Sequence, residues 1–482
     1  MKKLRLAALL LAAGWSLSAA AQVSRVEDLH YPPLPPFAIP QPERLVLGNG
    51  LVVMLLEDHE LPLVDATVLI RTGSRFDPAD QAGLAVLGAR AMRAGGTGSL
   101  PGDALDGYLE SRAAEIEITA EEDLTRATVS SLAADFPQVF RVFADLLRRP
   151  AFDAPEVEVA RTQAITDVSR RNDNPGKVAL RELRRIVYGA DSPYGRAETP
   201  ATLGAIRREN LIGWHAAAFH PDRMVLGLVG DFQRKEAVAL IRQVFGDWPR
   251  GAAWHPQPAS YRQQPAPGVY YVEKPGIAQS SIQMGHLGVL VSDPDFYALE
   301  VLNQVLSGSF SSRLFADVRT RKSLGYAVWG AVDSEWDHPG LASLYLSTKA
   351  ETTGAGVEAL LEEARSLTEL PPTEEEVSRA RQGLLNSFVF RFDSPREVLA
   401  RQLLLEYHGY PLDWLSRYRA GIEAVTSDQV RRAARHWRPD DFTILVVGPN
   451  QGRDKPLTDF GTVTVLAGAS APARPDVDAG RP

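Results

Sequence analysis

The sequence predicts an α+β fold built twice in one chain, each copy a mixed sheet with helices packed on one face. The segment FHPDRMVLGLVGDF (219–232) aligns with WRPDDFTILVVGPN (437–450), and EVEVARTQ (156–163) aligns with EEEVSRAR (374–381). Both alignments have the same offset of 218 residues. A constant offset over separated segments is typical of an internal duplication. At 482 residues the chain is long enough for two such units.

Strand-like and helical stretches are grouped in a way that favours an α+β arrangement. The strand-like stretches are β-branched or alternating and are bounded by Gly, Asp or Pro. They are LVVMLLE (51–57), DATVLIRTG (65–73), EIEITAE (115–121) and MVLGLVG (224–230). The helical stretches carry apolar residues at three- and four-residue spacing. They are AGLAVLGARAMRAG (82–95), FPQVFRVFADLLRRP (136–150) and PEVEVARTQAITDVSRR (155–171).

The start of the chain is typical of a secretory signal peptide. Basic residues at positions 2, 3 and 5 precede an apolar stretch from 6 to 17, and Ala19 and Ala21 suit a cleavage site before Gln22. The alternative, a membrane anchor, is disfavoured because the apolar stretch falls short of about 20 residues. We therefore expect an exported protein, periplasmic if the source is a Gram-negative bacterium, with no membrane span after cleavage.

Composition shifts divide the remaining chain. Pro-rich segments precede the first unit and separate the two units, and a low-complexity stretch ends the chain. The predicted order is a signal peptide (1–21), a Pro-rich lead-in (22–42), the first unit (43–253), a linker (254–268), the second unit (269–450) and a C-terminal tail with a disordered end (451–482).

Composition also excludes several kinds of chemistry. The net charge of −8, without a long basic run, argues against a nucleic-acid partner. The chain has no Cys, so it forms no disulfide, offers no thiolate nucleophile, and must bind zinc, if at all, through His, Asp or Glu. A serine hydrolase is poorly supported because no G-x-S-x-G motif is present.

Six segments, in order, resemble the landmarks of one peptidase family. They are NGLVVMLLEDHELPLV (49–64), RTGSRFDPADQAGLA (71–85), MRAGGT (92–97), NDNP (172–175), YGADSPYGR (188–196) and SSRLFADVRTRKSLGYAV (311–328). Together they are similar to the pitrilysin/insulinase family of zinc peptidases, the inverzincins, over about residues 43–450. The resemblance implies a chain that forms half of a peptide-enclosing chamber.

The resemblance identifies the segment of this chain that corresponds to the family's zinc helix, and that segment lacks the zinc ligands. Family members carry H-x-x-E-H on that helix, with two His as ligands and Glu as general base. Set on that pattern, Val86 and Arg90 take the His positions, Ala89 takes the Glu position, and Asp167 falls where the third ligand is expected. A single carboxylate does not hold a catalytic zinc ion. We expect no metal in this chain, and we expect Arg90 to pair with Asp167 in a partly buried groove between helices.

A second family feature is kept in the other half. Arg319 and Tyr326 match an Arg/Tyr pair that family members place over the zinc site, where guanidinium and phenol donors stabilise developing negative charge. In part of the family, zinc and the Arg/Tyr pair lie on different chains. The resemblance therefore implies a non-catalytic subunit that acts on a peptide substrate with a homologous zinc-bearing partner.

Two other interpretations stay open at this stage. One is a scaffold or peptide-binding protein with the same fold and no role in proteolysis. Another is an active peptidase with an unrecognised site. A metal site at His215 and His220 is disfavoured, because five residues separate them and place them on different helix faces.

Overall fold

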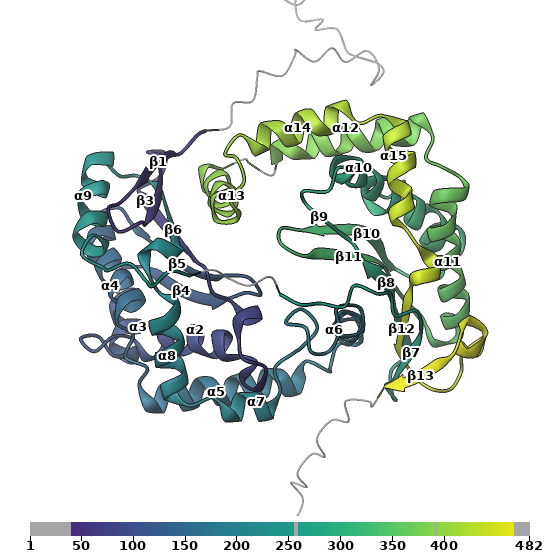
Figure 1. Ribbon diagram of the computed structural model, residues 1–482, viewed down its shortest axis with the longest axis horizontal. Helices are drawn as coiled ribbons and strands as arrows, with labels where there is room; N and C mark the ends of the chain where they lie inside the picture. Colours follow the sequence, from purple (N-terminus) through teal and green to yellow (C-terminus); the bar gives the residue numbers. More distant parts are fainter. Residues whose placement is uncertain (1–39, 255–258, 391, 393, 467–482) are drawn as a thin grey trace, which may run out of the picture. The chain divides into compact units, whose positions relative to one another are not determined.

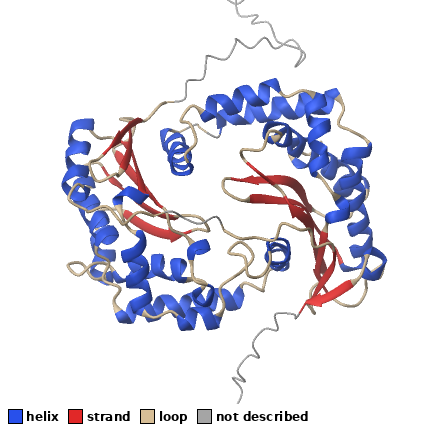
Figure 2. Ribbon diagram, in the orientation of Figure 1, coloured by secondary structure: helices blue, strands red, loops and turns tan. Residues whose placement is uncertain are grey.

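A computed structural model describes residues 40–254, 259–390, 392 and 394–466 of the chain. The predicted signal peptide, nearly all of the Pro-rich lead-in and the end of the tail lie outside the described residues. Two sheets organise the rest, and most of the helices cover one face of each sheet (Figure 2). The predicted α+β fold is confirmed.

The first sheet has six strands in the order β1-β2-β6-β3-β5-β4 (Figure 1). The strands are β1 (Glu43–Val46), β2 (Val52–Glu57), β3 (Leu63–Ile70), β4 (Glu115–Ala120), β5 (Thr125–Leu132) and β6 (Met224–Gly230). Alternation of buried and half-buried residues along β5 shows one face turned to the core. Strand β4 lies at the edge of the sheet and pairs only with β5 among the described strands.

The second sheet has seven strands in the order β13-β7-β12-β8-β11-β10-β9. The strands are β7 (Gly268–Glu273), β8 (Gln279–Leu287), β9 (Val289–Leu290), β10 (Ala327–Glu335), β11 (Pro339–Lys349), β12 (Thr443–Gly448) and β13 (Val463–Leu466). Strand β13 falls within the segment expected to be C-terminal tail, and it extends the sheet by pairing with β7.

The two sheets share one topology, as the 218-residue offset predicts. In the first sheet β6 runs parallel to β2 and antiparallel to β3. In the second, β12 runs parallel to β7 and antiparallel to β8 in the same way. Strands β3, β5 and β4 then follow one another as an antiparallel series, matched by β8, β11 and β10. The internal duplication is therefore visible strand by strand.

Helices cover the outer face of each sheet. In the first half they are α2 (Leu84–Gly95), α3 (Gly102–Glu110), α4 (Phe136–Arg148), α5 (Ala154–Arg170), α7 (Pro200–Ala205), α8 (Arg208–Ala218) and α9 (Arg234–Phe245). In the second half they are α10 (Phe296–Ser307), α11 (Thr353–Glu369), α12 (Glu374–Phe390), α14 (Trp414–Ala424) and α15 (Ser427–Ala433). Within the described residues, no helix has the length and apolar character needed to cross a membrane.

Each half also lends one helix to the sheet of the other half. Helix α6 (Pro175–Tyr188) packs on β8 and β12, and α13 (Pro395–His408) packs on β6 and β3 (Figure 1). Residue Gly227 permits the second contact, because a Cβ there would lie 2.6 Å from a methyl carbon of Leu403. Periodicity within each half did not predict this exchange, because a helical pattern does not say which sheet the helix covers.

Candidate functional site

Helix α2 carries the residues that the sequence aligns with the zinc helix, and its first turn is held by a buried carboxylate. The Asp77 carboxylate caps its first turn, accepting hydrogen bonds from the backbone N–H of Gly83 at 2.9 Å and of Ala85 at 3.1 Å. Burial raises the pKa of Asp77 to about 7, and these backbone hydrogen bonds oppose the rise. On another side of α2, Gly88 lets the Trp214 ring approach so closely that a Cβ would lie 2.6 Å from it.

The side chains on this helix do not form a metal site. Val86 is half-buried, Ala89 is buried in the core, and neither offers a ligand atom. The Arg90 guanidinium donates to the Asp167 carboxylate at 2.9 Å, so the one carboxylate at the position is already paired. These residues do not fit a zinc ion, which takes three protein ligands at catalytic sites.

The pairing of Arg90 with Asp167 occurs as expected, but its predicted environment is wrong. The Asp167 side chain is 66% exposed and the Arg90 side chain 34% exposed. Asp167 lies on the exposed face of α5. The ion pair is therefore a surface pair, and it does not compensate a buried charge.

A cavity of about 530 Å³ lies between α2 and the edge strand β4. Val86, Arg90 and Arg93 line one side, and residues 115–120 line the other. The Arg93 guanidinium donates to the Ile116 carbonyl at 2.7 Å and also pairs with Asp106 at 2.8 Å. An edge strand recruits an added strand through its free backbone groups, and Arg93 occupies one of the acceptors of β4.

The described residues contain two other groups of possible metal ligands, and both are engaged by arginine. Asp123, Asp337 and His338 form the first group, in which Arg75 pairs with both carboxylates. Asp293, Asp295 and His436 form the second, in which Arg435 pairs with Asp295 at 2.8 Å. A guanidinium between carboxylates already supplies the positive charge that a cation would bring.

The rejected pair His215 and His220 binds backbone rather than metal. Each ring contacts a backbone carbonyl, His215 that of Leu147 at 2.8 Å and His220 that of Ala216 at 3.0 Å. Burial lowers the pKa of His215, which favours its neutral form. Both residues are half-buried.

In the second half, Arg319 and Tyr326 lie together. Arg319 belongs to a π-helix, η5 (Phe315–Arg321), and Tyr326 directly precedes β10. The guanidinium carbon lies over the Tyr326 ring, 4.2 Å from its centroid, and over the Phe315 ring, 4.9 Å from its centroid. Phe310 completes the group at 5.7 Å. We call these four residues the Arg319 cluster. Short π-helical segments are rare and occur frequently at functional sites.

Two buried acidic residues, Asp317 of η5 and Glu363 of α11, connect this π-helix to α11. Asp317 is 8% exposed and pairs with Lys322 at 2.7 Å, with Arg321 and, through a hydrogen bond, with Glu363 of α11. Burial alone would raise the pKa of Asp317, but the bonds from Lys322 and Glu363 hold it below its ordinary value. Burial and the contact with Asp317 raise the pKa of Glu363 to about 7.

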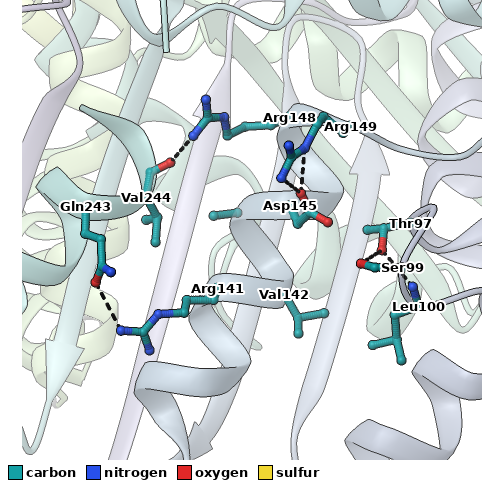
Figure 3. Close-up of a pocket in the computed structure, with 11 residues that line it drawn as sticks. Thr97, Ser99, Leu100, Arg141, Val142, Asp145, Arg148, Arg149, Gln243 and Val244 are labelled. Carbon is teal, nitrogen blue, oxygen red and sulfur yellow. Dashed lines mark hydrogen bonds and ion pairs between the residues drawn. The ribbon is translucent and has the colours of Figure 1, made fainter. Parts of the chain in front are cut away.

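A further groove, of about 420 Å³, lies between α4 and α9 (Figure 3). Its arginines are each committed to a neighbour: Arg141 donates to Gln243 at 3.1 Å, Arg148 to the Val244 carbonyl at 2.6 Å, and Arg149 to Asp145. The first two contacts connect α4 to α9, and the third connects Arg149 to the last turn of α4. We assign this groove no ligand.

Three residues that shape these regions were not found from the sequence. Phe310 and Phe315 lie in the segment SGSFSSRLF (307–315). In the sequence, nothing in this segment indicates that the two rings lie beside Arg319. Arg93 lies one helical turn beyond Arg90, and only the position of β4 reveals what its guanidinium contacts. An aromatic residue in a Ser/Gly loop is the one signal that would have drawn attention to Phe310.

Profiles of one peptidase family match most of the chain. Residues 52–196 match the profile described as insulinase (peptidase family M16), and residues 205–384 match the profile described as peptidase M16 inactive domain. An uncharacterized zinc protease of Mycobacterium tuberculosis strain H37Rv is 26% identical over 87% of this chain and 95% of its own length. The non-peptidase homolog YmxG of Helicobacter pylori is 24% identical over 84% of this chain and 93% of its own length.

Solved structures agree with these matches. A peptidase M16 inactive domain from Pseudomonas fluorescens superposes with a TM-score of 0.77 and 26% identity, covering 86% of this chain and 99% of that one. A protease from Helicobacter pylori gives a TM-score of 0.74 at 18% identity, covering 85% of this chain and 100% of that one, which shows the shared fold.

Proposed function

We infer the function from one premise: the chain belongs to the insulinase family of peptidases, family M16. We propose that it is a non-catalytic pseudopeptidase subunit that supplies Arg319 and Tyr326 to the substrate site of a zinc-bearing homologous partner. The observation that carries the proposal is the contrast between the halves. The zinc position offers one carboxylate, already paired with Arg90, while the Arg/Tyr pair is intact, with Arg319 half-buried and Tyr326 exposed.

The geometry of Arg319 and Tyr326 suits stabilisation of developing negative charge. The guanidinium carbon lies over two rings, and no residue in the described ranges accepts a hydrogen bond from the guanidinium, so its N–H groups remain available as donors. Tyr326, whose ring contacts Arg319, is exposed, and its phenol O–H is a second donor. Two such donors aimed at a peptide carbonyl resemble an oxyanion hole in function.

The state of the first half supports the same division of labour. Arg93 already occupies an acceptor of the edge strand, next to a zinc position without a zinc ligand set. We propose that the peptide pairs instead with the sheet edge of the zinc-bearing partner. The signal-peptide pattern at residues 1–21 supports export, so we place this complex outside the cytoplasm, in the periplasm of a Gram-negative source.

Reconstitution tests the proposal. The purified chain is mixed with a homologous chain from the same source that has an intact H-x-x-E-H motif, and cleavage of a quenched-fluorescent peptide library is followed. We expect activity that neither chain has alone. The variant Tyr326→Phe keeps the ring beneath Arg319 but removes one donor, and the turnover of the mixture should fall about 10²- to 10³-fold.

The first half provides a matched control. Arg112 lies over the ring of Tyr108 at 3.9 Å, the same kind of stacked pair away from the Arg319 cluster. Tyr108→Phe and Arg112→Ala should leave turnover unchanged. A mixture that stays fully active when both Arg319 and Tyr326 are replaced would instead support the scaffold interpretation.

A further inference from the structure

A cavity of about 190 Å³ lies in the second half, among α10, α12, α13, α14 and the end of β10. Most of its lining is aromatic, and the rings are those of Phe296, Trp336, Phe388, Phe392, Trp414 and Tyr418. Two charged residues, Glu300 of α10 and Arg401 of α13, also line it. We call this cavity the aromatic pocket. Tyr326 precedes β10 and Ser334 of the pocket lies near the other end of that strand, so at about 3.3 Å per residue roughly 25 Å separates the pocket from the Arg319 cluster.

Contacts between the rings fix the walls of the aromatic pocket. The Trp414 ring stacks on Tyr418 with centroids 5.2 Å apart, and the Phe388 ring stacks on the same Tyr418 at 5.9 Å. The half-buried Trp336 stacks on His408 of α13 at 4.8 Å. Aromatic rings in offset or edge-on geometry attract one another beyond the burial of apolar area. The lining therefore favours an occupant that carries an aromatic ring of its own.

The volume of the aromatic pocket limits this occupant to one ring. A cavity of about 150 Å³ holds a benzene molecule. The aromatic pocket, at about 190 Å³, therefore has room for one six-membered ring with a short polar substituent.

Glu300 brings a negative charge to the aromatic pocket. It is half-buried, and its Oε2 accepts a hydrogen bond from the Tyr418 hydroxyl at 2.8 Å, which orients the carboxylate. Within the described ranges, no basic side chain forms an ion pair with Glu300. A carboxylate beside aromatic ring faces attracts an ammonium group, because both the charge and the rings favour a cation.

Arg401 brings the opposite charge. Its guanidinium carbon lies over the Trp414 ring, 5.8 Å from the centroid. A guanidinium has five N–H donors, so Arg401 can keep its contacts within the protein and still donate to the carboxylate of a ligand. The polar groups of the aromatic pocket therefore match a molecule that carries both charges.

We propose that the aromatic pocket binds a free aromatic amino acid of the size of phenylalanine. Its ring lies among the aromatic side chains, its ammonium group binds Glu300, and its carboxylate binds Arg401. Small-molecule sites commonly combine an apolar lining with a few polar groups that fix orientation. The inference goes beyond the proposed function and does not depend on Arg319 or Tyr326.

Isothermal titration calorimetry of the purified chain with small probes tests the proposal. L-Phenylalanine carries the ring and both charges, phenethylamine lacks the carboxylate, and 3-phenylpropionate lacks the ammonium group. We expect L-phenylalanine to bind most tightly and each of the other two about 10-fold more weakly, because each leaves one charged group of the pocket without its partner. L-Leucine, which keeps both charges and lacks the ring, should bind about 3-fold more weakly than L-phenylalanine.

Two variants assign each charge to its residue. Glu300→Gln should weaken the binding of L-phenylalanine and phenethylamine about 10-fold and leave 3-phenylpropionate unchanged. Arg401→Gln should weaken L-phenylalanine and 3-phenylpropionate and leave phenethylamine unchanged. The matched control is Glu423→Gln, which removes a carboxylate of α14 that is 48% exposed and pairs with Arg419. It should bind all probes as the parent chain does.

The probe series on the unmodified chain decides the question even if a variant fails to fold. No saturable binding of L-phenylalanine, in a chain shown to be folded by circular dichroism, would overturn the proposal. Phenethylamine binding as tightly as L-phenylalanine would overturn it in favour of a site for organic cations. L-Phenylalanine binding that survives Glu300→Gln undiminished would place the ligand elsewhere and also overturn it.

Discussion

Two regions built by one duplicated fold have diverged in opposite directions. At the zinc position, the backbone framework persists: Asp77 still caps α2, and α2 still packs against α5, but the side chains that would do chemistry are replaced. In the Arg319 cluster, a half-buried arginine on a rare π-helical segment lies among aromatic rings, two of which, Phe310 and Tyr326, are exposed, and the segment contains the buried Asp317. The comparison teaches that a fold can keep its backbone framework after the side chains for chemistry are gone. Packing between elements stabilises the framework, whereas a few single side chains supply the chemistry.

The largest expected effect comes from restoring the missing ligands. The triple variant Val86→His, Arg90→His, Asp167→Glu places two imidazoles four residues apart on α2 and a longer carboxylate on α5. Since Arg90 and Asp167 already meet at 2.9 Å, we expect zinc binding with a dissociation constant of about 1 μM or tighter, and we expect no such binding by the parent chain. Isothermal titration with zinc measures it.

The control for this variant is the same triple change with Val86→Asn, which removes one imidazole. It should bind zinc far more weakly. Failure of the full triple variant to bind zinc, in a chain that remains folded by circular dichroism, would mean that the framework of the zinc position has been lost along with its side chains.

The buried support of the Arg319 cluster should be the next most sensitive point. Asp317→Asn removes a buried charge of η5 that pairs with Lys322 and Arg321, and removing one partner of a buried ion pair costs about 3 kcal/mol. Urea denaturation measures the free energy of unfolding. A loss below about 0.5 kcal/mol would place Asp317 among surface residues and remove the contrast between the two regions.

Glu363 should give the second region a pH dependence. Its pKa is raised to about 7 in the folded chain, so the folded state holds a proton that the unfolded state releases near the ordinary Glu value. Stability from this group is thus complete below the ordinary value and is lost as the pH rises towards 7. Glu363→Gln should flatten the fall in Tm between pH 5 and 8, whereas Glu362→Gln, its exposed neighbour, should not.

The smallest effect belongs to the zinc position. Arg90→Ala and Asp167→Asn each break the ion pair between α2 and α5, but exposed pairs contribute about 0 to 1 kcal/mol. We expect the free energy of unfolding to change by less than about 0.5 kcal/mol. A loss several times larger would show that the pair compensates a buried charge, as the sequence suggested.

Features that repeat along the chain were predictable, and features made by contacts between distant segments were not. The offset of 218 residues anticipated that β6 and β12 are equivalent, and the four-residue spacing placed Val86 and Arg90 on one helix face. The exchange of α6 and α13, the exposure of Asp167 and the contact of Arg93 with β4 depend on how whole elements meet. Sequence periodicity describes one element at a time and does not contain that information.

The most direct test of the account is the metal content of the unmodified chain. The purified protein is incubated with excess zinc, desalted, and analysed by inductively coupled plasma mass spectrometry, while cleavage of the fluorogenic peptide library is measured on the same sample. Because Val86, Ala89 and Arg90 offer no ligand and Asp167 is paired, the account predicts zinc far below one equivalent per chain and no cleavage. About one tightly held zinc per chain with chelator-sensitive cleavage would contradict it.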